Sequence, residues 1–199
     1  MERKLVNTNT INIVGTLTDV DLKTAATKDG REYISGTIIV KSNEKDYKIR
    51  LFTMKMTKKN EVSKIYNNFL TLGDAINKRV SVNGSIDEAK IPESNTIKRG
   101  NQLSGQFISI LPSNSEEKDV AEFEIVGFIK QALTAIYEPD GVTIKDYSLV
   151  IANPNYNCSL AKYIRLNVDK TNQGAINTLI NSFAVKDTAS FHGNLDFVI

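Results

Sequence analysis

The sequence predicts a mainly β protein built from two tandem copies of one strand-rich unit. Three observations carry this prediction: apolar and polar residues alternate over several short segments, each half holds one segment with helical periodicity, and short sequences of the first half recur in the second. The 199 residues are 41% hydrophobic and 24% charged, which is typical of a globular chain with a core. No segment approaches the ~20 apolar residues that cross a bilayer, so we expect no membrane span.

Five short segments recur in the same order in both halves, at spacings of 109 to 115 residues. They are Ile13-Val14-Gly15 with Ile125-Val126-Gly127, Asp29-Gly30 with Asp140-Gly141, Ile49-Arg50-Leu51 with Ile164-Arg165-Leu166, residues 65–69 with 179–183, and residues 83–87 with 192–196. Collinear matches of this kind indicate two copies of one unit. A polar segment with a proline follows the first copy. We therefore predict a first domain over 1–111, a linker over 112–120 and a second domain over 121–199.

Both copies contain the same order of elements. In the first copy, alternation predicts strands over Thr10–Thr18, Tyr33–Val40, Asp46–Thr53, Arg79–Ile86 and Gly105–Leu111, with a polar loop over Asp19–Gly30. A helix follows the third strand, with Asn60 as its N-cap and an apolar face of Val62, Ile65, Tyr66 and Phe69. The second copy repeats that face as Ile176, Leu179, Ile180 and Phe183.

This order of three strands, one helix and two strands is typical of an OB-fold, a five-stranded Greek-key barrel with a helix between strands three and four. The first copy also resembles the single-stranded DNA-binding protein family over most of residues 8–111. The likeness lies in residues 12–15 (Asn-Ile-Val-Gly), 33–40, 47–52 and 80–84. The resemblance implies an early strand that ends at a glycine and a third strand with basic and aromatic residues. With the repeat, it suggests a tandem two-OB form, as in phage or mobile-element replication proteins.

The scarcity of reactive side chains excludes most enzyme chemistry. Cys158 is the only cysteine and His192 the only histidine, so internal disulfides, cysteine-built metal clusters and histidine-dependent triads are excluded. We read Cys158 as an incidental loop thiol and His192, which aligns with Asn83, as a turn residue. The sequence predicts a binding protein with no catalytic site, no metal and no cofactor. We expect a cytoplasmic location, in the host cytoplasm if the source is viral.

The charges divide unevenly between the copies. Residues 1–111 carry 18 Lys and Arg against 12 Asp and Glu, while residues 112–199 carry 7 against 11. On an OB-fold, nucleic acid binds the face of strands two and three and the flanking loops. Lys48, Arg50 and Phe52 share one face of the third strand, and no acidic residue lies between Leu51 and Asn60. The other predicted contacts are Lys55, Lys58 and Lys59 after that strand, Lys28 and Arg31 (with Lys23) in the loop after strand one, and Lys90, Lys98 and Arg99 in the loop after strand four.

Aromatic rings supply the second half of a single-strand site, because bases stack on them. Phe52 is the first stacking candidate, with a core position as the alternative. Tyr33 either stacks or caps the barrel, whereas Tyr47 and Tyr66 are predicted core residues. In the second copy Tyr163 and Arg165 form an auxiliary nucleic-acid site, with Asn167 beside them. Because the surrounding residues Glu138, Asp140 and Asp146 are acidic, this unit is an auxiliary DNA contact, a dimer surface or a docking site for a replication partner. Further rings for stacking are Tyr137, Tyr147 and Tyr156.

The sequence thus predicts a non-catalytic protein that binds and protects single-stranded DNA in replication or recombination. The alternative function is an OB-fold interaction or scaffold module of a replication complex. Single-stranded DNA is the predicted ligand, replication or recombination proteins are further candidate partners, and homo-oligomerisation stays open.

Repeat counting adds an expectation about the second barrel. Its copy ends three residues after Asp196, so the fifth strand is predicted to be absent. A barrel open at this point exposes a strand edge. The chain is then a fragment, or another segment fills the gap, or a second molecule does. We favour the fragment.

Overall fold

The computed structural model describes residues 8–93, 96–154 and 160–196, and for residues 90–93 and 96–99 it describes the backbone alone. The described chain is mainly β, with nine strands, two α-helices and one short 3₁₀ helix. It divides into two compact units. We call the first the barrel unit, formed by Thr10–Ile86, Gln102–Phe123 and His192–Ile199, and the other the second unit, formed by Met1–Asn9, Asp87–Asn101 and Glu124–Phe191.

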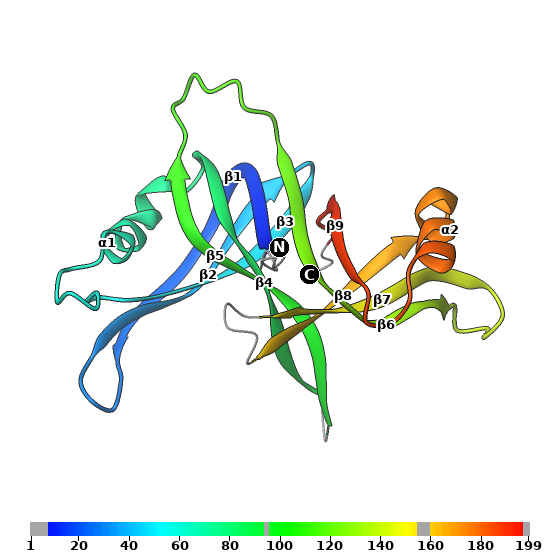
Figure 1. Cartoon of the computed structure of the whole chain (residues 1–199). Coiled ribbons are helices and arrows are strands. Elements are labelled where there is room, and N and C mark those ends of the chain that lie inside the picture. Colours follow the sequence, from blue (N-terminus) through cyan, green and yellow to red (C-terminus); the bar gives the residue numbers. More distant parts are fainter. Residues whose placement is uncertain (1–7, 94–95, 155–159, 197–199) are drawn as a thin grey trace, which may run out of the picture. The chain divides into compact units, whose positions relative to one another are not determined.

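Five strands close the barrel, and Figure 1 shows them in blue to green. They are β1 (Asn9–Ala26), β2 (Glu32–Ser42), β3 (Lys45–Met54), β4 (Arg79–Glu93) and β5 (Thr96–Ile110). β1 pairs antiparallel with β2 and β4, and β2 pairs antiparallel with β3. β3 pairs parallel with β5, which neighbours β4 and completes the ring. This is the strand order of an OB-fold, which confirms the mainly β class and the barrel predicted for the first copy.

Alternating apolar residues fill the barrel. Within the barrel one face of the strands is buried, as for Ile13, Ile38, Ile49 and Val82, while most of the intervening side chains are partly or fully exposed. Tyr47 and Tyr66 are also buried, at 2% and 5% exposure, which confirms the prediction that both are core residues. The hydroxyl of Tyr47 donates a hydrogen bond to the carbonyl of Leu195 at 3.0 Å, so its polar end is satisfied inside the unit.

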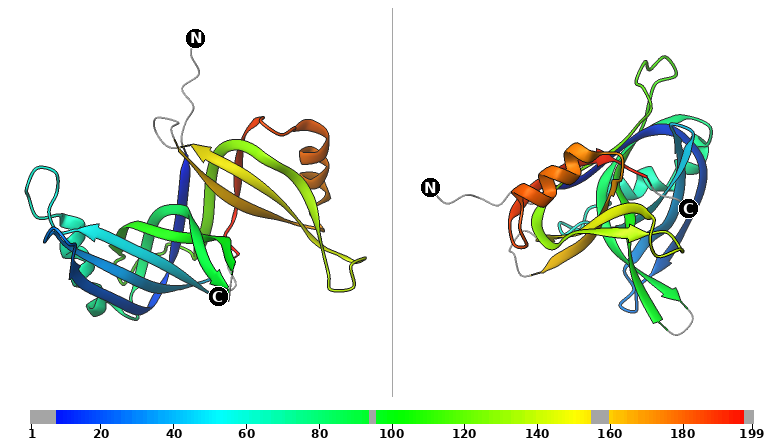
Figure 2. Two further views of the ribbon diagram at one scale, coloured as in Figure 1. Left: turned by 90° about the horizontal axis from the view of Figure 1, so that it is seen from below. Right: turned by 90° about the vertical axis from the view of Figure 1, so that its right-hand side faces the viewer.

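The predicted loop over Asp19–Gly30 is wrong, because β1 continues to Ala26 and pairs with β2 along this whole length. Figure 2 shows the two strands as one long curved hairpin. Only residues 27–31 connect them, and Lys23 therefore lies on a strand. Side chains 19–26 are partly or fully exposed, so this part of β1 lacks the apolar alternation that marks a strand. At the bend Gly36 has φ +154°, and a Cβ there would lie 1.9 Å from the carbonyl oxygen of Asp21, so only glycine fits.

The helix after β3 starts later than predicted. α1 spans Lys64–Leu70, a 3₁₀ turn η1 (Leu72–Ala75) follows, and Ser63 is the N-cap, with its Oγ accepting from the Tyr66 amide at 3.4 Å. The prediction of Asn60 as N-cap is wrong: Asn60 has φ +58°, in the turn before the helix. Val62 lies outside the helix and bridges to Met56.

The predicted loop after strand four is also wrong. β4 runs on to Glu93 and β5 begins at Thr96, so these residues form a two-stranded extension of the barrel strands. Its outer part, Asp87–Asn101, clusters with the second unit.

The second unit is formed mainly by β6 (Val120–Tyr137), β7 (Ile144–Pro154), β8 (Ala161–Asp169), α2 (Gln173–Ser182) and β9 (Thr188–Asn194). β7 pairs antiparallel with β6 and β8, and β9 pairs with β6. The Asp87 carboxylate pairs with Lys162 of β8. The Asn101 side chain binds the backbone of Arg165, donating to its carbonyl at 2.6 Å and accepting from its amide at 3.2 Å. The β4–β5 extension thus contacts β8 through both of its strands.

Two further segments are anchored within the barrel unit. Asp119 accepts hydrogen bonds from the Arg79 guanidinium and, at 3.0 Å, from the Asn43 amide. Near the other end of the chain, Leu195 donates its amide to the Ala121 carbonyl at 2.9 Å, and Lys45 pairs with Asp196 at 2.7 Å. Because both anchors involve long-range partners, they hold the flanking chain against the barrel.

Candidate nucleic-acid interface

The outer face of the β2–β3 ladder holds the first group of predicted site residues. Lys48 lies opposite Ile39, Arg50 opposite Thr37 and Phe52 opposite Ser35. Residues opposite each other in an antiparallel pair point to the same face, so these side chains form one row. Their neighbours Ile49 and Leu51 are fully buried on the inner face. The structure therefore confirms the alternation on β3 that we used to place Lys48, Arg50 and Phe52 together.

Two aromatic rings meet on this face. The centroids of Tyr33 and Phe52 are 5.5 Å apart, with a 39° angle between the ring planes. Phe52 is 53% exposed, so it is not a core residue. A pair of rings of which one is half exposed offers a flat apolar surface beside solvent, which is the kind of surface on which a nucleobase stacks.

The cations near this face divide into two groups. Lys48 and Arg50 are exposed, and among the described residues no carboxylate pairs with either side chain. The same holds for three more lysines, Lys28, Lys58 and Lys59, of which the last two lie in the turn between β3 and α1. Unpaired cations are available to phosphate without first losing a partner.

The second group of cations is paired with nearby carboxylates. Arg31 contacts Asp29 at 2.7 Å, Lys55 contacts Glu32 at 2.9 Å, and Lys23 contacts Asp21 at 3.5 Å. The hydrogen bond and the charge of Glu32 raise the pKa of Lys55. Hydrogen bonds from Thr27 and the backbone, together with the charge of Arg31, lower the pKa of Asp29. The charges of these cations are therefore partly neutralised by the neighbouring carboxylates.

Three predicted contacts cannot be placed on the interface. The side chains of Lys90, Lys98 and Arg99 lie outside the described residues, and only their backbone is described, in β4 and β5. Among the rings and reactive groups, Tyr156 and Cys158 also lie outside the described residues.

The auxiliary residues lie on β8 of the second unit. Tyr163 is 38% exposed, and Arg165 is exposed on the same face, opposite Val150 of β7. Two acidic residues, Asp146 and Asp169, oppose each other at the end of this ladder. The face thus combines one ring and one cation with two negative charges, which repel phosphate. This face therefore has fewer rings and fewer cations for a single strand than the β2–β3 face does.

Sequence reasoning missed Glu32 and Asp29 as site residues. Both are visible as acidic neighbours of predicted cations, but the partner of Glu32 is set by strand register. Lys55 donates its amide to the Glu32 carbonyl at 2.9 Å, and this backbone bond brings the two side chains together. The pairing cannot be read from residues 23 positions apart in the chain.

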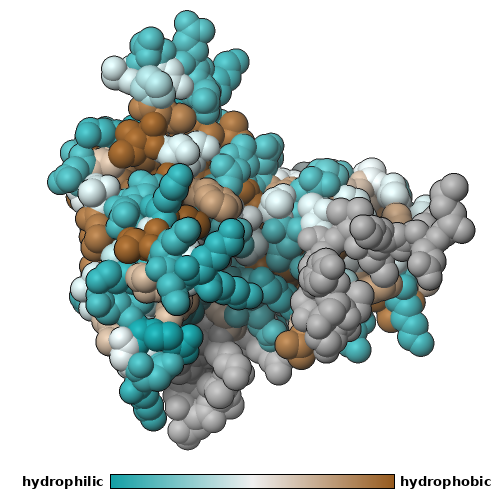
Figure 3. Space-filling view, turned by 60° about the vertical axis from the view of Figure 1, so that its left-hand side comes forward, coloured by the Kyte–Doolittle hydropathy of each residue, from teal (hydrophilic) through white to brown (hydrophobic). Residues whose placement is uncertain are grey.

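Apolar side chains are exposed elsewhere on the barrel unit as well. Phe107 on β5 is 58% exposed and Leu70 at the end of α1 is 52% exposed. On the face shown in Figure 3, hydrophobic patches lie between hydrophilic residues. Within the described ranges, no helix is long and apolar enough to cross a membrane, and no three His, Cys, Asp or Glu side chains form a group that could hold a metal ion.

Two solved structures share this fold over nearly the whole chain. The wild-type single-stranded DNA binding protein from Thermus aquaticus has a TM-score of 0.57 and 14% identity, covering 94% of this chain and 84% of its own. A deletion mutant of the same protein has a TM-score of 0.57 and 15% identity, with coverages of 94% and 85%. At this identity the likeness establishes the fold alone.

Comparisons of sequence add a family. No curated protein matches the chain at a significant level. A family model described as YorF matches residues 7–198, nearly the entire sequence. The chain belongs to the YorF family.

Proposed function

We propose that this chain is a non-catalytic single-stranded DNA-binding protein that covers and protects DNA during replication or recombination. The observation that carries the proposal is the half-exposed Phe52 ring, paired with Tyr33, on the same strand face as the unpaired Lys48 and Arg50. Single strands bind where cations follow the phosphates and rings accept the bases, and this face of the barrel provides both. The predicted contacts Lys28, Lys58 and Lys59 extend the positive charge.

The structural neighbours support the proposal. Both Thermus aquaticus proteins are single-stranded DNA binding proteins by description, and each aligns over 94% of this chain. An OB-fold uses the face of strands two and three for oligonucleotides. Lys48 and Arg50 of this chain lie on that face, and Lys58 and Lys59 lie in the turn that follows β3.

We further propose that the second unit is a second OB-like copy with an auxiliary role. Its strands β6, β7, β8 and β9 pair in the order of β1, β2, β3 and β4. In the barrel, β5 lies along β3 beside Arg50; in the second unit, Asn101 lies beside the equivalent Arg165. In this proposal the β4–β5 extension occupies the position along β8 that β5 occupies along β3, and Tyr163 and Arg165 make a weaker DNA contact.

A scaffold module of a replication complex is the second candidate function. Exposed apolar side chains on other elements, such as Phe107 on β5 and Leu70 on α1, favour it, because such residues are common in protein contacts. In that case replication or recombination proteins, or a second copy of the chain, bind there, and nucleic acid does not bind.

Fluorescence anisotropy with labelled oligo-dT separates the two functions. We expect saturable binding that weakens as salt rises, since phosphate contacts release counterions. Duplex DNA of equal length should bind more weakly because its bases cannot stack on the rings, and oligo-U reports the preference for DNA over RNA. A scaffold would show no salt-dependent binding to any of these. Light scattering after size exclusion measures the oligomeric state on the same samples.

A further inference from the structure

The end of the β2–β3 hairpin that carries the aromatic rings also carries an ion pair. Glu32 directly precedes Tyr33, and Lys55 follows the strand that holds Phe52. Their side chains meet at 2.9 Å, and the backbone bond from Lys55 to Glu32 fixes the two chain segments beside each other. The pair is partly exposed, at 36% for the lysine side chain and 53% for the carboxylate. The ion pair thus lies at the same end of the ladder as the ring pair, one residue from Tyr33 along the chain.

We infer that Glu32 occupies the phosphate site of Lys55 and so limits the affinity of this surface for single-stranded nucleic acid. The inference rests on the proposed function and adds a residue that tunes it. A carboxylate and a phosphate compete for the same ammonium group, because both offer anionic oxygens at hydrogen-bond distance. In the wild-type chain Lys55 stays with Glu32, and Lys48 and Arg50 make the productive phosphate contacts.

The arrangement around the pair favours this role over a purely structural one. The backbone ladder already joins β2 and β3 from Ser42 to Tyr33, so the hairpin does not need an exposed ion pair to close. Exposed pairs of this type add little to folding stability. An anion at the ring-bearing end of the hairpin, in contrast, repels a polyanionic ligand that binds there.

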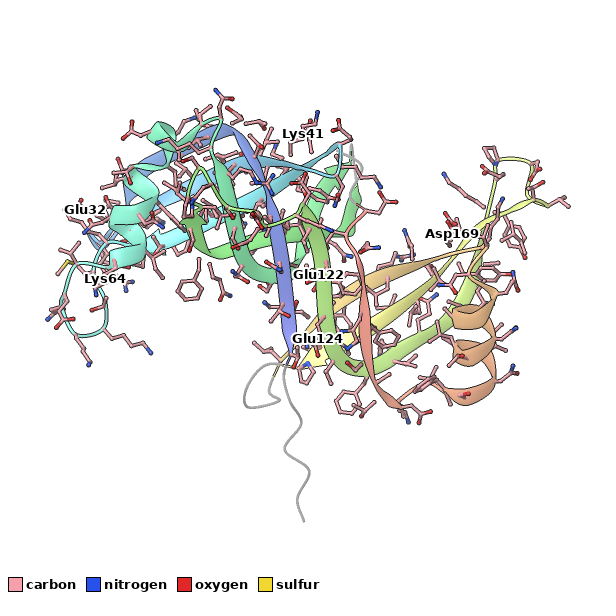
Figure 4. All side chains as sticks on the ribbon, turned by 90° about the horizontal axis from the view of Figure 1, so that it is seen from above. Glu32, Lys41, Lys64, Glu122, Glu124 and Asp169 are labelled. Carbon is pink, nitrogen blue, oxygen red and sulfur yellow. The ribbon has the colours of Figure 1, made fainter. Side chains whose placement is uncertain are left out.

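The chain also offers a matched control. Glu44 pairs with Lys41 at 3.1 Å, again on the β2–β3 hairpin. Figure 4 shows Glu32 and Lys41 at opposite ends of the barrel unit. Replacing either glutamate by glutamine changes the net charge equally and frees one lysine. Glu32 lies at the end of the ladder that carries the rings, whereas Glu44 lies in the turn at the other end.

A double-mutant cycle with a short labelled oligo-dT tests the inference. The variants are Glu32→Gln, Lys55→Gln, the double variant and Glu44→Gln, all in the full chain, with thermal melting to verify folding. We expect Glu32→Gln to bind roughly three- to tenfold tighter, with a salt slope steeper by about 0.7, the value for one single-strand phosphate contact. Lys55→Gln alone should change affinity less than about twofold, and in the double variant it should cancel the gain.

Any of four results would overturn the inference. If Lys55→Gln weakens binding as much as loss of Arg50 does, Lys55 already binds phosphate in the wild type. If the gain from Glu32→Gln persists without Lys55, or if Glu44→Gln matches it, the gain is a general charge effect. If the wild type binds no oligonucleotide, the proposed function itself fails, and this inference fails with it.

Discussion

The Tyr33 ring lies diagonally across the β2–β3 ladder from the Phe52 ring, with centroids 5.5 Å apart. Ser35 is the residue directly opposite Phe52, so Tyr33 is its diagonal neighbour, two residues along the same face. Beside the tyrosine, Phe52 keeps 53% of its surface exposed, so burial stabilises it little. The exposed part of the ring is accessible to a planar ligand.

Phe52→Ala should weaken oligo-dT binding by ~1–3 kcal/mol, because one base loses its stacking surface. Phe107→Ala is the matched control, since Phe107 is equally exposed but lies on β5. It should leave the affinity unchanged. Anisotropy titrations measure both. A Phe52→Ala protein that melts early yet binds normally would show that the ring serves the fold.

Arg50→Glu should weaken binding of every single-stranded sequence at least about tenfold and flatten the salt dependence by about 0.7 or more. The arginine is exposed on the face of the ring pair and contacts backbone phosphates in the proposed complex. Arg165→Glu makes the same charge change at the equivalent position of the second unit and should cost less. Equal losses would place the main contact outside the β2–β3 face or divide it between the units.

Gly84→Ala should destabilise the barrel unit by ~1–3 kcal/mol or more, as overpacking does. A Cβ at this position would lie 1.9 Å from the carbonyl oxygen of Ser104 on β5. Gly73→Ala is the control, because no heavy atom lies within 4 Å of its Cβ position. Urea melts of both proteins measure the difference. A stable Gly84→Ala protein would mean that β4 and β5 separate at no cost.

The Arg79–Asp119 pair predicts a loss of stability in acid. Burial raises the pKa of Asp119, but hydrogen bonds from Arg79 and the Asn43 amide and the charge of Arg79 outweigh it, so the folded-state pKa lies below its ordinary value of 3.8. Its contribution is therefore present at neutral pH and is lost as the pH falls below ~4 through the folded-state pKa. Asp119→Asn should cost about 1 kcal/mol at pH 7 and flatten the decline, which urea melts from pH 7 to pH 3 would reveal. A parallel decline in both proteins would contradict this.

Strand periodicity predicted the parts of the barrel that enclose the core. β2 and β3 alternate because one face is buried in the barrel core while the other meets solvent, and the alternation of apolar and polar residues records this difference. The outer half of β1 and the β4–β5 extension do not show it. For side chains 19–26 neither face is fully buried, so the chain there is polar and reads as a loop although it pairs as a strand.

For the candidate site, the sequence predicts which side chains share a face but not which of them are paired. Alternation alone places Lys48, Arg50 and Phe52 together. It does not show that Lys55 is paired whereas Lys48 is not, because ion pairs across strands depend on register and rotamer. The N-cap failed for a related reason: Ser63 and Asn60 are both good capping residues, and the isolated bridge of Met56 with Val62 delays the helix to the later one.

Because the barrel unit takes residues from both sides of the second unit's main segment, the order of synthesis determines when the barrel can be completed. The barrel unit takes its last residues from 192 onward, and between Phe123 and that point the ribosome adds only residues of the second unit. At ~5–20 residues per second this interval lasts roughly 3–14 s. Throughout it, the hydroxyl of Tyr47 and the Ala121 carbonyl lack the Leu195 backbone that pairs with them in the finished protein. The barrel unit therefore lacks these two backbone contacts until the second unit has been synthesised.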